Sequence, residues 1–140
     1  MPDPVLCSLL RIDRMRLRAL RRDLAPYGYG GVMHLILHCV SSDPGVSQEQ
    51  VACFFALDKT SVARDARKLE EMGHIRREID PANRRRYRMY LTAEGEQMMQ
   101  TIFRAYDDFA RKLSEGLPQE DWQQLKRILG RLEENALSNG

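Results

Sequence analysis

The spacing of apolar residues changes from a helical to an extended period after Gly73, and this change limits the folds open to the chain. Before Gly73, the pattern predicts two short helices over residues 47–57 and 59–72. After it, alternating residues at 75–79 and 87–91 predict the two strands of a β-hairpin. Two short helices joined by a tight turn and followed by a hairpin form a winged helix-turn-helix, whose second helix can enter the major groove of DNA.

Local capping signals support the boundaries of these two helices. Ser47 and Gln50 have the spacing of a capping box, in which each side chain satisfies a free backbone donor. Asp58 can cap the next helix, and Gly73 suits the left-handed position after its end. Three apolar residues of the first short helix are expected to be buried: Val51, Phe54 and Phe55.

Four further helices are predicted around this unit. An amphipathic helix with leucines mostly three or four residues apart covers residues 6–24, and a shorter, more apolar helix follows at 32–42. Two more come after the hairpin, one capped by Thr92 and interrupted at Gly116, and one that begins at Pro118. The expected fold is therefore mainly α, a winged helix-turn-helix with six helices and a small β-hairpin wing.

The first and last helices each carry a narrow apolar stripe that needs a partner. The interior helices and the hairpin can close their own core, so the surplus apolar surface is best buried against a second copy of the chain. We therefore expect a two-fold homodimer. Residues 1–30 are assigned to an N-terminal dimerisation helix and break, 31–92 to the DNA-binding lobe, and 93–140 to C-terminal dimerisation helices.

The composition fits one ordinary globular domain. The chain has 140 residues, of which 43% are hydrophobic, and no apolar run approaches the roughly 20 residues that cross a bilayer. The N-terminus lacks the layout of a signal peptide, so a cytoplasmic protein with no membrane partner is expected. The three cysteines have neither paired spacing nor an even count, which argues against a disulfide framework or a zinc site. No metal and no cofactor are expected.

The middle of the chain carries most of the positive charge. Residues 58–91 contain ten Lys or Arg against six Asp or Glu, whereas the formal net charge of the whole chain is only +2. A basic segment indicates a polyanionic partner, here double-stranded DNA. Six side chains of the helix at 59–72 are candidates for DNA contacts: Lys59, Thr60, Ser61, Arg64, Arg67 and Lys68. Arg64 is the best candidate for reading a base, because an arginine there can reach guanine O6 and N7 with two donors.

The hairpin is expected to end in a long basic loop over residues 80–86. This loop carries three consecutive arginines: Arg84, Arg85 and Arg86. Extended guanidinium groups on a loop can enter a minor groove or straddle its phosphates, so at least one of them is expected to contact DNA. The alternative to DNA contact is a role in solubility or a salt bridge to Asp80, and one of the three is expected to tie down the loop.

Three stretches of the sequence resemble the MarR family of bacterial regulators. Residues 80–85 are similar to the Asp-x-x-Asp-Arg-Arg wing of that family, and residues 91–95 (Leu-Thr-Ala-Glu-Gly) are similar to its strand exit. Residues 57–73 resemble its recognition helix and glycine stop. Asn83 stands where the family usually has Asp, so either the wing is looser or Asp80 substitutes for the missing carboxylate.

The resemblance implies a triangular dimer with two DNA-binding lobes, an effector pocket near the junction of the lobes with the terminal helices, and no catalytic activity. We therefore expect a ligand-responsive repressor that binds a palindromic operator and releases it when a small molecule favours a splayed dimer. Two alternatives stay open, a winged-helix module that binds an acidic protein surface and a thiol-based redox sensor of the same fold. An enzyme is not supported, because the sequence shows no nucleophile and base pair, phosphate loop or carboxylate cluster.

Five residues are candidates for sensing an effector or an oxidant. Tyr27 and Tyr29, in the break between the first two helices, can shape one wall of a ligand pocket or merely form a turn. His34 and His38 are four residues apart on the second helix and are candidates for the same pocket, although two ligands do not make a metal site. Cys7 is followed one turn later by an arginine that can favour its thiolate, but a buried small residue explains it as well.

Overall fold

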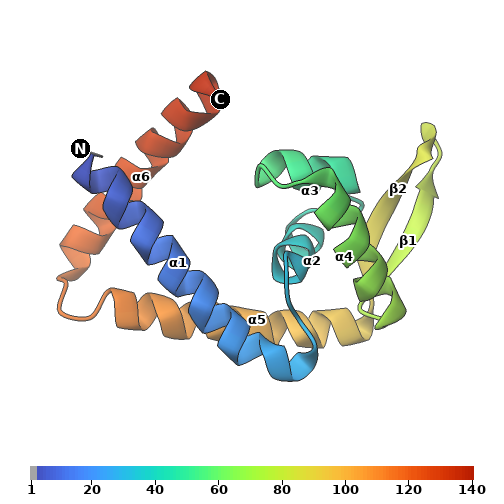
Figure 1. Cartoon of the computed structure of the whole chain (residues 1–140), viewed down its shortest axis with the longest axis horizontal. Helices are drawn as coiled ribbons and strands as arrows, with labels where there is room; N and C mark the ends of the chain where they lie inside the picture. Colours follow the sequence, from blue (N-terminus) through green and yellow to red (C-terminus); the bar gives the residue numbers. More distant parts are fainter. Residues whose placement is uncertain (1–2) are drawn as a thin grey trace. The chain divides into compact units, whose positions relative to one another are not determined.

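The computed structural model describes residues 3–140, which form a mainly helical fold with one two-stranded hairpin (Figure 1). The order of the elements confirms the predicted six helices and hairpin wing. In chain order the elements are α1 (Pro4–Leu24), the 3-10 turn η1 (Ala25–Tyr27), α2 (Met33–Ser42), α3 (Gln48–Phe54), α4 (Lys59–Glu71), β1 (Ile75–Asp80), β2 (Asn83–Leu91), α5 (Ala93–Leu113) and α6 (Gln119–Asn139).

Local signals explain both ends of α1. The Asp3 carboxylate accepts a hydrogen bond from the Val5 N–H at 2.8 Å, which caps the helix. After the helix, η1 leads to Gly28, whose φ of 79° lies in the left-handed region that glycine reaches without strain. Only the last turns of α1 are buried, at Leu20 and Leu24.

The core of the first 106 residues is built around α2. Ile36, Leu37 and Val40 of this helix are fully buried, and α3, α4 and β2 pack against it. The predicted capping box of α3 is present, because the Ser47 side chain accepts from the Gln50 N–H (3.2 Å) and the Gln50 side chain accepts from the Ser47 N–H (2.8 Å). Burial of each large apolar side chain stabilises the fold by roughly 1.5–3 kcal/mol, so this small core can hold the helices in place.

Phe54 departs from the burial pattern that the sequence predicts for α3. Val51 is fully buried and Phe55 is half-buried, whereas Phe54 is 67% exposed, so the prediction for Phe54 is wrong. Phe55 lies one helical turn after Val51 and shares its face, and the adjacent Phe54 therefore points elsewhere. The Phe54 ring instead packs edge to face on the Phe55 ring, with centroids 4.8 Å apart.

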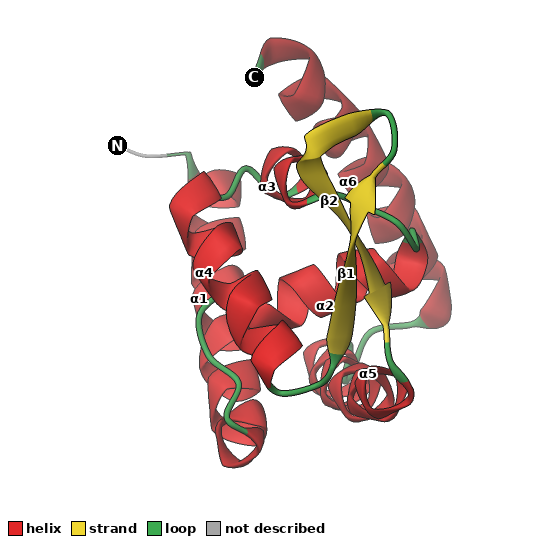
Figure 2. Ribbon diagram, turned by 90° about the vertical axis from the view of Figure 1, so that its right-hand side faces the viewer, coloured by secondary structure: helices red, strands yellow, loops and turns green. Residues whose placement is uncertain are grey.

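The hairpin has longer strands and a shorter turn than the sequence predicts (Figure 2). β1 extends to Asp80 and β2 begins at Asn83, so the expected long loop at 80–86 is wrong. The physical reason is the Asp80 carboxylate, which accepts the Ala82 N–H at 2.9 Å and closes a tight turn.

The three arginines at 84–86 accordingly lie on β2 rather than on a loop. Ile79 pairs with Tyr87, and the next residue of β1 pairs with Asn83, so the register shifts between these two pairs. The arginines therefore form a bulge of β2 that has no residue of β1 opposite it.

Residues Asp107–Gly140 form a second compact unit. It contains the end of α5 and all of α6, and the turn between them includes Gly116 with a φ of 82°. α6 begins after Pro118, as the sequence predicts, and none of its residues is buried in the described chain. No helix formed by residues 3–140 is both long enough and apolar enough to span a membrane.

Candidate nucleic-acid interface

α4 is the second helix of the helix-turn-helix, and local signals determine both of its ends. The Asp58 carboxylate accepts hydrogen bonds from the Ser61 N–H and the Ser61 hydroxyl, both at 3.0 Å, and these bonds lower the pKa of Asp58. Gly73 follows the helix end with a φ of 77°. Val62 and Leu69 are fully buried toward the rest of the core, which leaves the opposite face of α4 open.

Lys59, Thr60 and Arg67 are exposed on α4, as the sequence predicts for residues that contact DNA. Neither of the two cations forms an ion pair with another residue of 3–140. Thr60 and Arg67 are seven residues apart, almost two helical turns, so they lie on the same face. Ser61 differs, because it is half-buried and its hydroxyl donates to Asp58.

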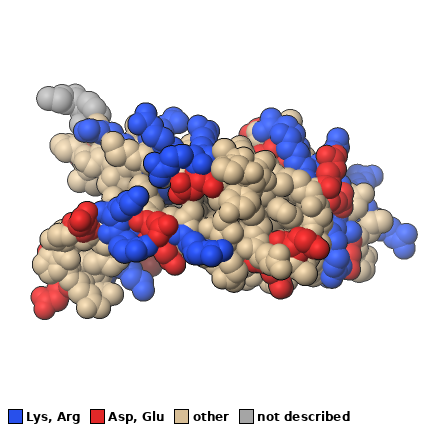
Figure 3. All heavy atoms as spheres, turned by 90° about the horizontal axis from the view of Figure 1, so that it is seen from below, with Lys and Arg blue, Asp and Glu red and all other residues tan. Residues whose placement is uncertain are grey.

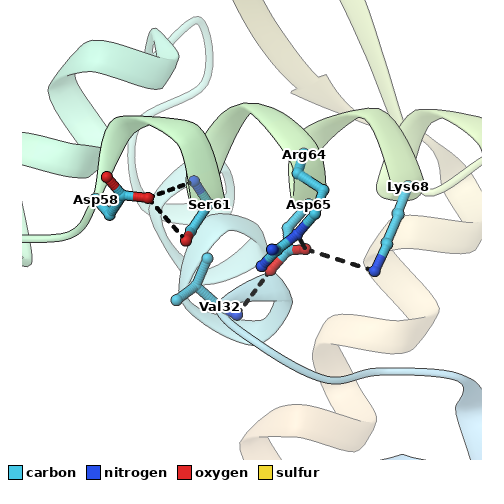
Figure 4. Close-up of polar contacts among 6 residues, drawn as sticks. All are labelled: Val32, Asp58, Ser61, Arg64, Asp65 and Lys68. Carbon is cyan, nitrogen blue, oxygen red and sulfur yellow. Dashed lines mark hydrogen bonds and ion pairs between the residues drawn. The ribbon is translucent and has the colours of Figure 1, made fainter.

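Arg64 and Lys68 bend toward Asp65, on the side of α4 that faces Val32 (Figure 4). The Arg64 Nε lies 3.2 Å from Asp65 Oδ1, and the Lys68 Nζ lies 3.9 Å from the same oxygen. Asp65 is only 1% exposed, and its Oδ2 accepts a hydrogen bond from the Val32 N–H at 2.9 Å. Sequence reasoning missed this residue, although its place three residues after the apolar Val62 was a signal that it lies on the buried face.

The arginines of the wing fall into two groups. Arg84 and Arg85 are exposed, and neither forms an ion pair within the described part of the chain. Arg86 is half-buried, and its Nε lies 3.7 Å from the Glu49 carboxylate at the start of α3. Arg84 and Arg85 are therefore available to DNA, whereas Arg86 connects the wing to α3.

Arg88, which the sequence did not single out, is the residue that anchors Asp80. Its Nη2 lies 3.2 Å from Asp80 Oδ1, so Arg88 makes the salt bridge that the sequence offered as an alternative role for the arginines at 84–86. Asn83 makes only a local bond, in which its side-chain oxygen accepts the Arg85 N–H at 3.1 Å. The asparagine left two possibilities, a looser wing or a wing in which Asp80 substitutes for the missing carboxylate. The contacts of Asp80 favour the second.

Arg77 joins the wing to the end of α4. Its Nε and Nη2 donate to the two carboxylate oxygens of Glu70 at 3.1 and 2.9 Å, and its guanidinium lies 4.9 Å from the centre of the Tyr87 ring. The hydrogen bond lowers the pKa of Glu70 and raises the pKa of Arg77, so both groups stay charged. A two-point contact of this kind restricts the position of β1 relative to α4.

Positive charge extends beyond α4 and the wing. Figure 3 shows Lys and Arg atoms both at the hairpin end of the molecule and along α1. Five arginines of α1 are exposed: Arg11, Arg14, Arg18, Arg21 and Arg22. Such a distribution strengthens attraction to a polyanion at long range without specifying a sequence.

His38 lines a cavity of about 540 Å³ beside α1, α2 and α5. The other lining residues are Asp13, Arg16, Leu35, Phe55, Leu57 and Tyr106. The His38 Nδ1 is buried and has no hydrogen-bond partner within residues 3–140. His34 is buried one turn earlier, and burial lowers its pKa to about 4. In this part of the chain, no three His, Cys, Asp or Glu side chains are grouped to hold a metal ion.

The two tyrosines after α1 differ in environment. Tyr29 is buried, its hydroxyl lies 2.6 Å from His74 Nδ1, and burial raises the pKa of Tyr29. The cavity that Tyr29 and His34 line measures only about 10 Å³, which leaves room for one water at most. Tyr27 is exposed, and Cys7 is exposed on α1.

Known proteins with similar sequences are regulators. A model of the MarR family matches residues 33–87, from α2 into β2. The transcriptional regulator HosA of Escherichia coli O111:H- is 32% identical over 98 residues, which cover 67% of this chain and 72% of HosA. A Thauera aromatica protein named as a regulator of the hcr operon is 33% identical over 84 residues, 57% of this chain, and the match spans about half (51%) of that protein's length.

Known structures share the fold over nearly the whole chain. The crystal structure of MarR has a TM-score of 0.84 at 30% identity, with 96% of this chain and 98% of that chain covered. CouR from Rhodococcus jostii RHA1, solved with p-coumaroyl-CoA bound, has a TM-score of 0.79 at 27% identity, with 93% and 92% covered. The match to the family model, the 32% identity to HosA and the fold shared with MarR show that the chain belongs to the MarR family of transcriptional regulators.

Proposed function

We propose that the protein is a repressor that binds a palindromic operator as a homodimer, with α4 in the major groove and the wing at the neighbouring minor groove. The observation that carries this proposal is that α4 and β2 expose cations without a carboxylate partner in residues 3–140, namely Lys59, Arg67, Arg84 and Arg85. Contacts from such cations to phosphates supply affinity, and contacts to base edges supply specificity. Two half-sites about 34 Å apart are expected, one helical turn of DNA.

Arg64 is proposed to read a base, while Lys59 and Ser61 contact phosphate at the groove margin. Arg64 is 56% exposed and is placed on α4 within one turn of Thr60, so its long side chain can reach the groove floor. Arg64→Ala is expected to weaken operator binding by about 1–3 kcal/mol and to relax discrimination at one base pair. An equal loss of affinity on every sequence would instead make Arg64 a phosphate contact.

A second copy of the chain is proposed to cover the apolar faces of α1 and α6. Both helices expose leucines at helical spacing, among them Leu6, Leu10, Leu129 and Leu132. This exposure supports dimerisation through residues 1–30 and 93–140, with residues 31–92 as the DNA-binding lobe. Sedimentation equilibrium is expected to give a dimer that Leu129→Glu dissociates, and a monomeric wild-type protein would contradict the proposal.

The cavity beside His38 is proposed to bind a small aromatic effector in the cytoplasm. Its walls include the rings of Phe55 and Tyr106, and its polar groups include Arg16 and the unpaired His38 Nδ1. The relative CouR was solved with p-coumaroyl-CoA bound, and the aromatic acyl group of that ligand supports an aromatic group in the effector. A ligand that binds more tightly when the two lobes are splayed would release the operator.

A gel-shift titration tests the repressor directly. The purified, reduced protein is added to DNA from beside its own gene over a series of salt concentrations, with random-sequence DNA as the competitor. Tight binding with a two-fold symmetric footprint is expected. The logarithm of the association constant should fall linearly with the logarithm of the salt concentration, with a slope of about −0.9 for each phosphate contacted. Binding no tighter than to random DNA would refute a sequence-specific regulator.

The same assay separates the two modes of release. Addition of p-coumaroyl-CoA tests the aromatic pocket, and addition of hydrogen peroxide to the wild type and to Cys7→Ser tests a thiol. Release by peroxide that depends on Cys7 would favour the redox sensor over the ligand-responsive repressor.

A further inference from the structure

Asp65 is the most buried carboxylate of residues 3–140, and the start of α2 holds it in place. Its Oδ2 accepts the Val32 N–H at 2.9 Å, at a helix terminus that no side chain of α2 caps. Gly31 provides the space, because a Cβ at that position would overlap Asp65 Oδ2. The Val32 N–H and the missing side chain at Gly31 therefore hold the carboxylate against the start of α2.

The other oxygen of Asp65 pairs with Arg64, although the Arg64 side chain stays 56% exposed. The Arg64 Nε lies 3.2 Å from Asp65 Oδ1, and the Lys68 Nζ lies 3.9 Å from it. Both cationic side chains bend toward this oxygen (Figure 4). A carboxylate buried to this degree is stable only while cations and hydrogen-bond donors compensate its charge. When Arg64 extends to a base, Asp65 keeps only Lys68 and the backbone donor.

We propose that Asp65 is a specificity-determining residue that withholds Arg64 from DNA of the wrong sequence. The inference rests on the proposed function, in which α4 reads DNA. While Arg64 is paired with a buried carboxylate, the pair has little net attraction for a phosphate, so binding to arbitrary duplexes is weak. A guanine offers O6 and N7 together and replaces the lost acceptor with two. Because specificity is a difference between two affinities, weakening the binding to wrong sequences increases it.

Asp65→Asn is the variant that tests this role. Asparagine keeps an oxygen that can accept the Val32 N–H but removes the charge that holds Arg64. Glu71→Gln is the matched control, because it removes one carboxylate from an exposed position of the same helix. Thermal unfolding of both variants verifies that they fold. The two DNA probes are a duplex selected from a random library by the wild-type protein and a shuffled duplex of equal composition.

Asp65→Asn is expected to raise affinity for the shuffled duplex about three- to tenfold. The slope of the logarithm of the association constant against the logarithm of salt concentration should steepen by about 0.9, because one more phosphate is contacted. The selected duplex should gain less, so the ratio of the two affinities falls. Glu71→Gln should change both affinities by a similar, smaller factor. In an Arg64→Ala background, Asp65→Asn should change binding no more than the control does, which a purely structural role of Asp65 does not predict.

Two results would overturn this inference and leave the proposed function intact. The first is weaker binding of Asp65→Asn to the selected duplex with unchanged binding to the shuffled one, which would make Asp65 a support for Arg64. The second is an equal gain in DNA affinity with and without Arg64, which would mean that Asp65 only repels DNA through its negative charge. A wild-type protein that selects no sequence at all refutes the proposed function, and this inference fails with it.

Discussion

At Gly95 the first turn of α5 passes so close to His74 that no side chain fits between them. A Cβ on Gly95 would overlap the His74 carbonyl oxygen and lie 3.0 Å from its carbonyl carbon, whereas ordinary contacts lie at 3.4–4 Å. Thr92 holds the same turn, because its N–H donates to the His74 oxygen (3.1 Å) and its hydroxyl accepts the Gly95 N–H (3.1 Å). Gly95→Ala must therefore move the start of α5 away from the segment that joins α4 to β1.

The free energy of unfolding should fall accordingly. Forcing an extra carbon into a packed site costs about 1–3 kcal/mol, and strain on the hydrogen bonds of Thr92 adds about 1 kcal/mol. Alanine offsets about 0.5–1 kcal/mol of this loss, because it is a better helix former than glycine. The expected net destabilisation by Gly95→Ala is about 1–3 kcal/mol.

Urea unfolding followed by circular dichroism measures this change, with all proteins at one concentration because a dimer's stability depends on it. Gly30→Ala is the control, since a Cβ at Gly30 meets no atom within 4 Å. It should leave stability unchanged or raise it by up to about 1 kcal/mol. If Gly95→Ala were as stable as Gly30→Ala, the close approach of α5 to His74 would not be the reason for a glycine at this position.

Two further predictions concern pH and salt. Burial holds the pKa of His34 at about 4, below its ordinary 6.5, so between these values the unfolded chain binds more protons and stability falls as the pH drops. Between pH 7 and pH 5 the loss is expected to be about 2 kcal/mol, and urea titrations of His34→Phe should depend less on pH; an unchanged dependence would exclude His34 as the source. Replacing Arg84 and Arg85 together by alanine should make the slope of the logarithm of the operator association constant against the logarithm of salt concentration shallower, by up to about 0.9 per residue. Arg86→Ala should flatten it less, because Arg86 already pairs with Glu49; equal flattening per residue would contradict this division of the wing.

The order of the elements could be predicted because its signals act over short distances along the chain. The Ser47 capping box, the Asp58 cap and the left-handed glycine at Gly73 each involve residues at most four positions apart. The change of hydrophobic period after Gly73 is equally local, and it identified the hairpin. The basic character of α4 could be predicted for the same reason.

The form of the wing could not be predicted, because it depends on contacts across the hairpin. Asp80 pairs with Arg88 on the opposite strand, and the tight turn next to this pair places residues 84–86 on β2. A run of polar residues has the same pattern in a loop and in an irregular edge strand. Phe54 was mistaken for a core residue on similar grounds, since only the packed structure shows which of two adjacent phenylalanines faces the core.

The succession of helices and strands, the basic character of the middle segment and the resemblance to the family could all be read from local patterns in the sequence. Which cations of α4 lack a carboxylate partner within residues 3–140 became visible only in the folded chain. Arg64 and Arg67 are indistinguishable as residue types on an exposed helix face, yet Arg64 is paired with Asp65 and Arg67 is not. The difference arises because α2 holds the Asp65 carboxylate in place from more than thirty residues away in the chain. Ion pairs depend on distances of a few ångströms between such remote elements, and a linear pattern does not contain those distances.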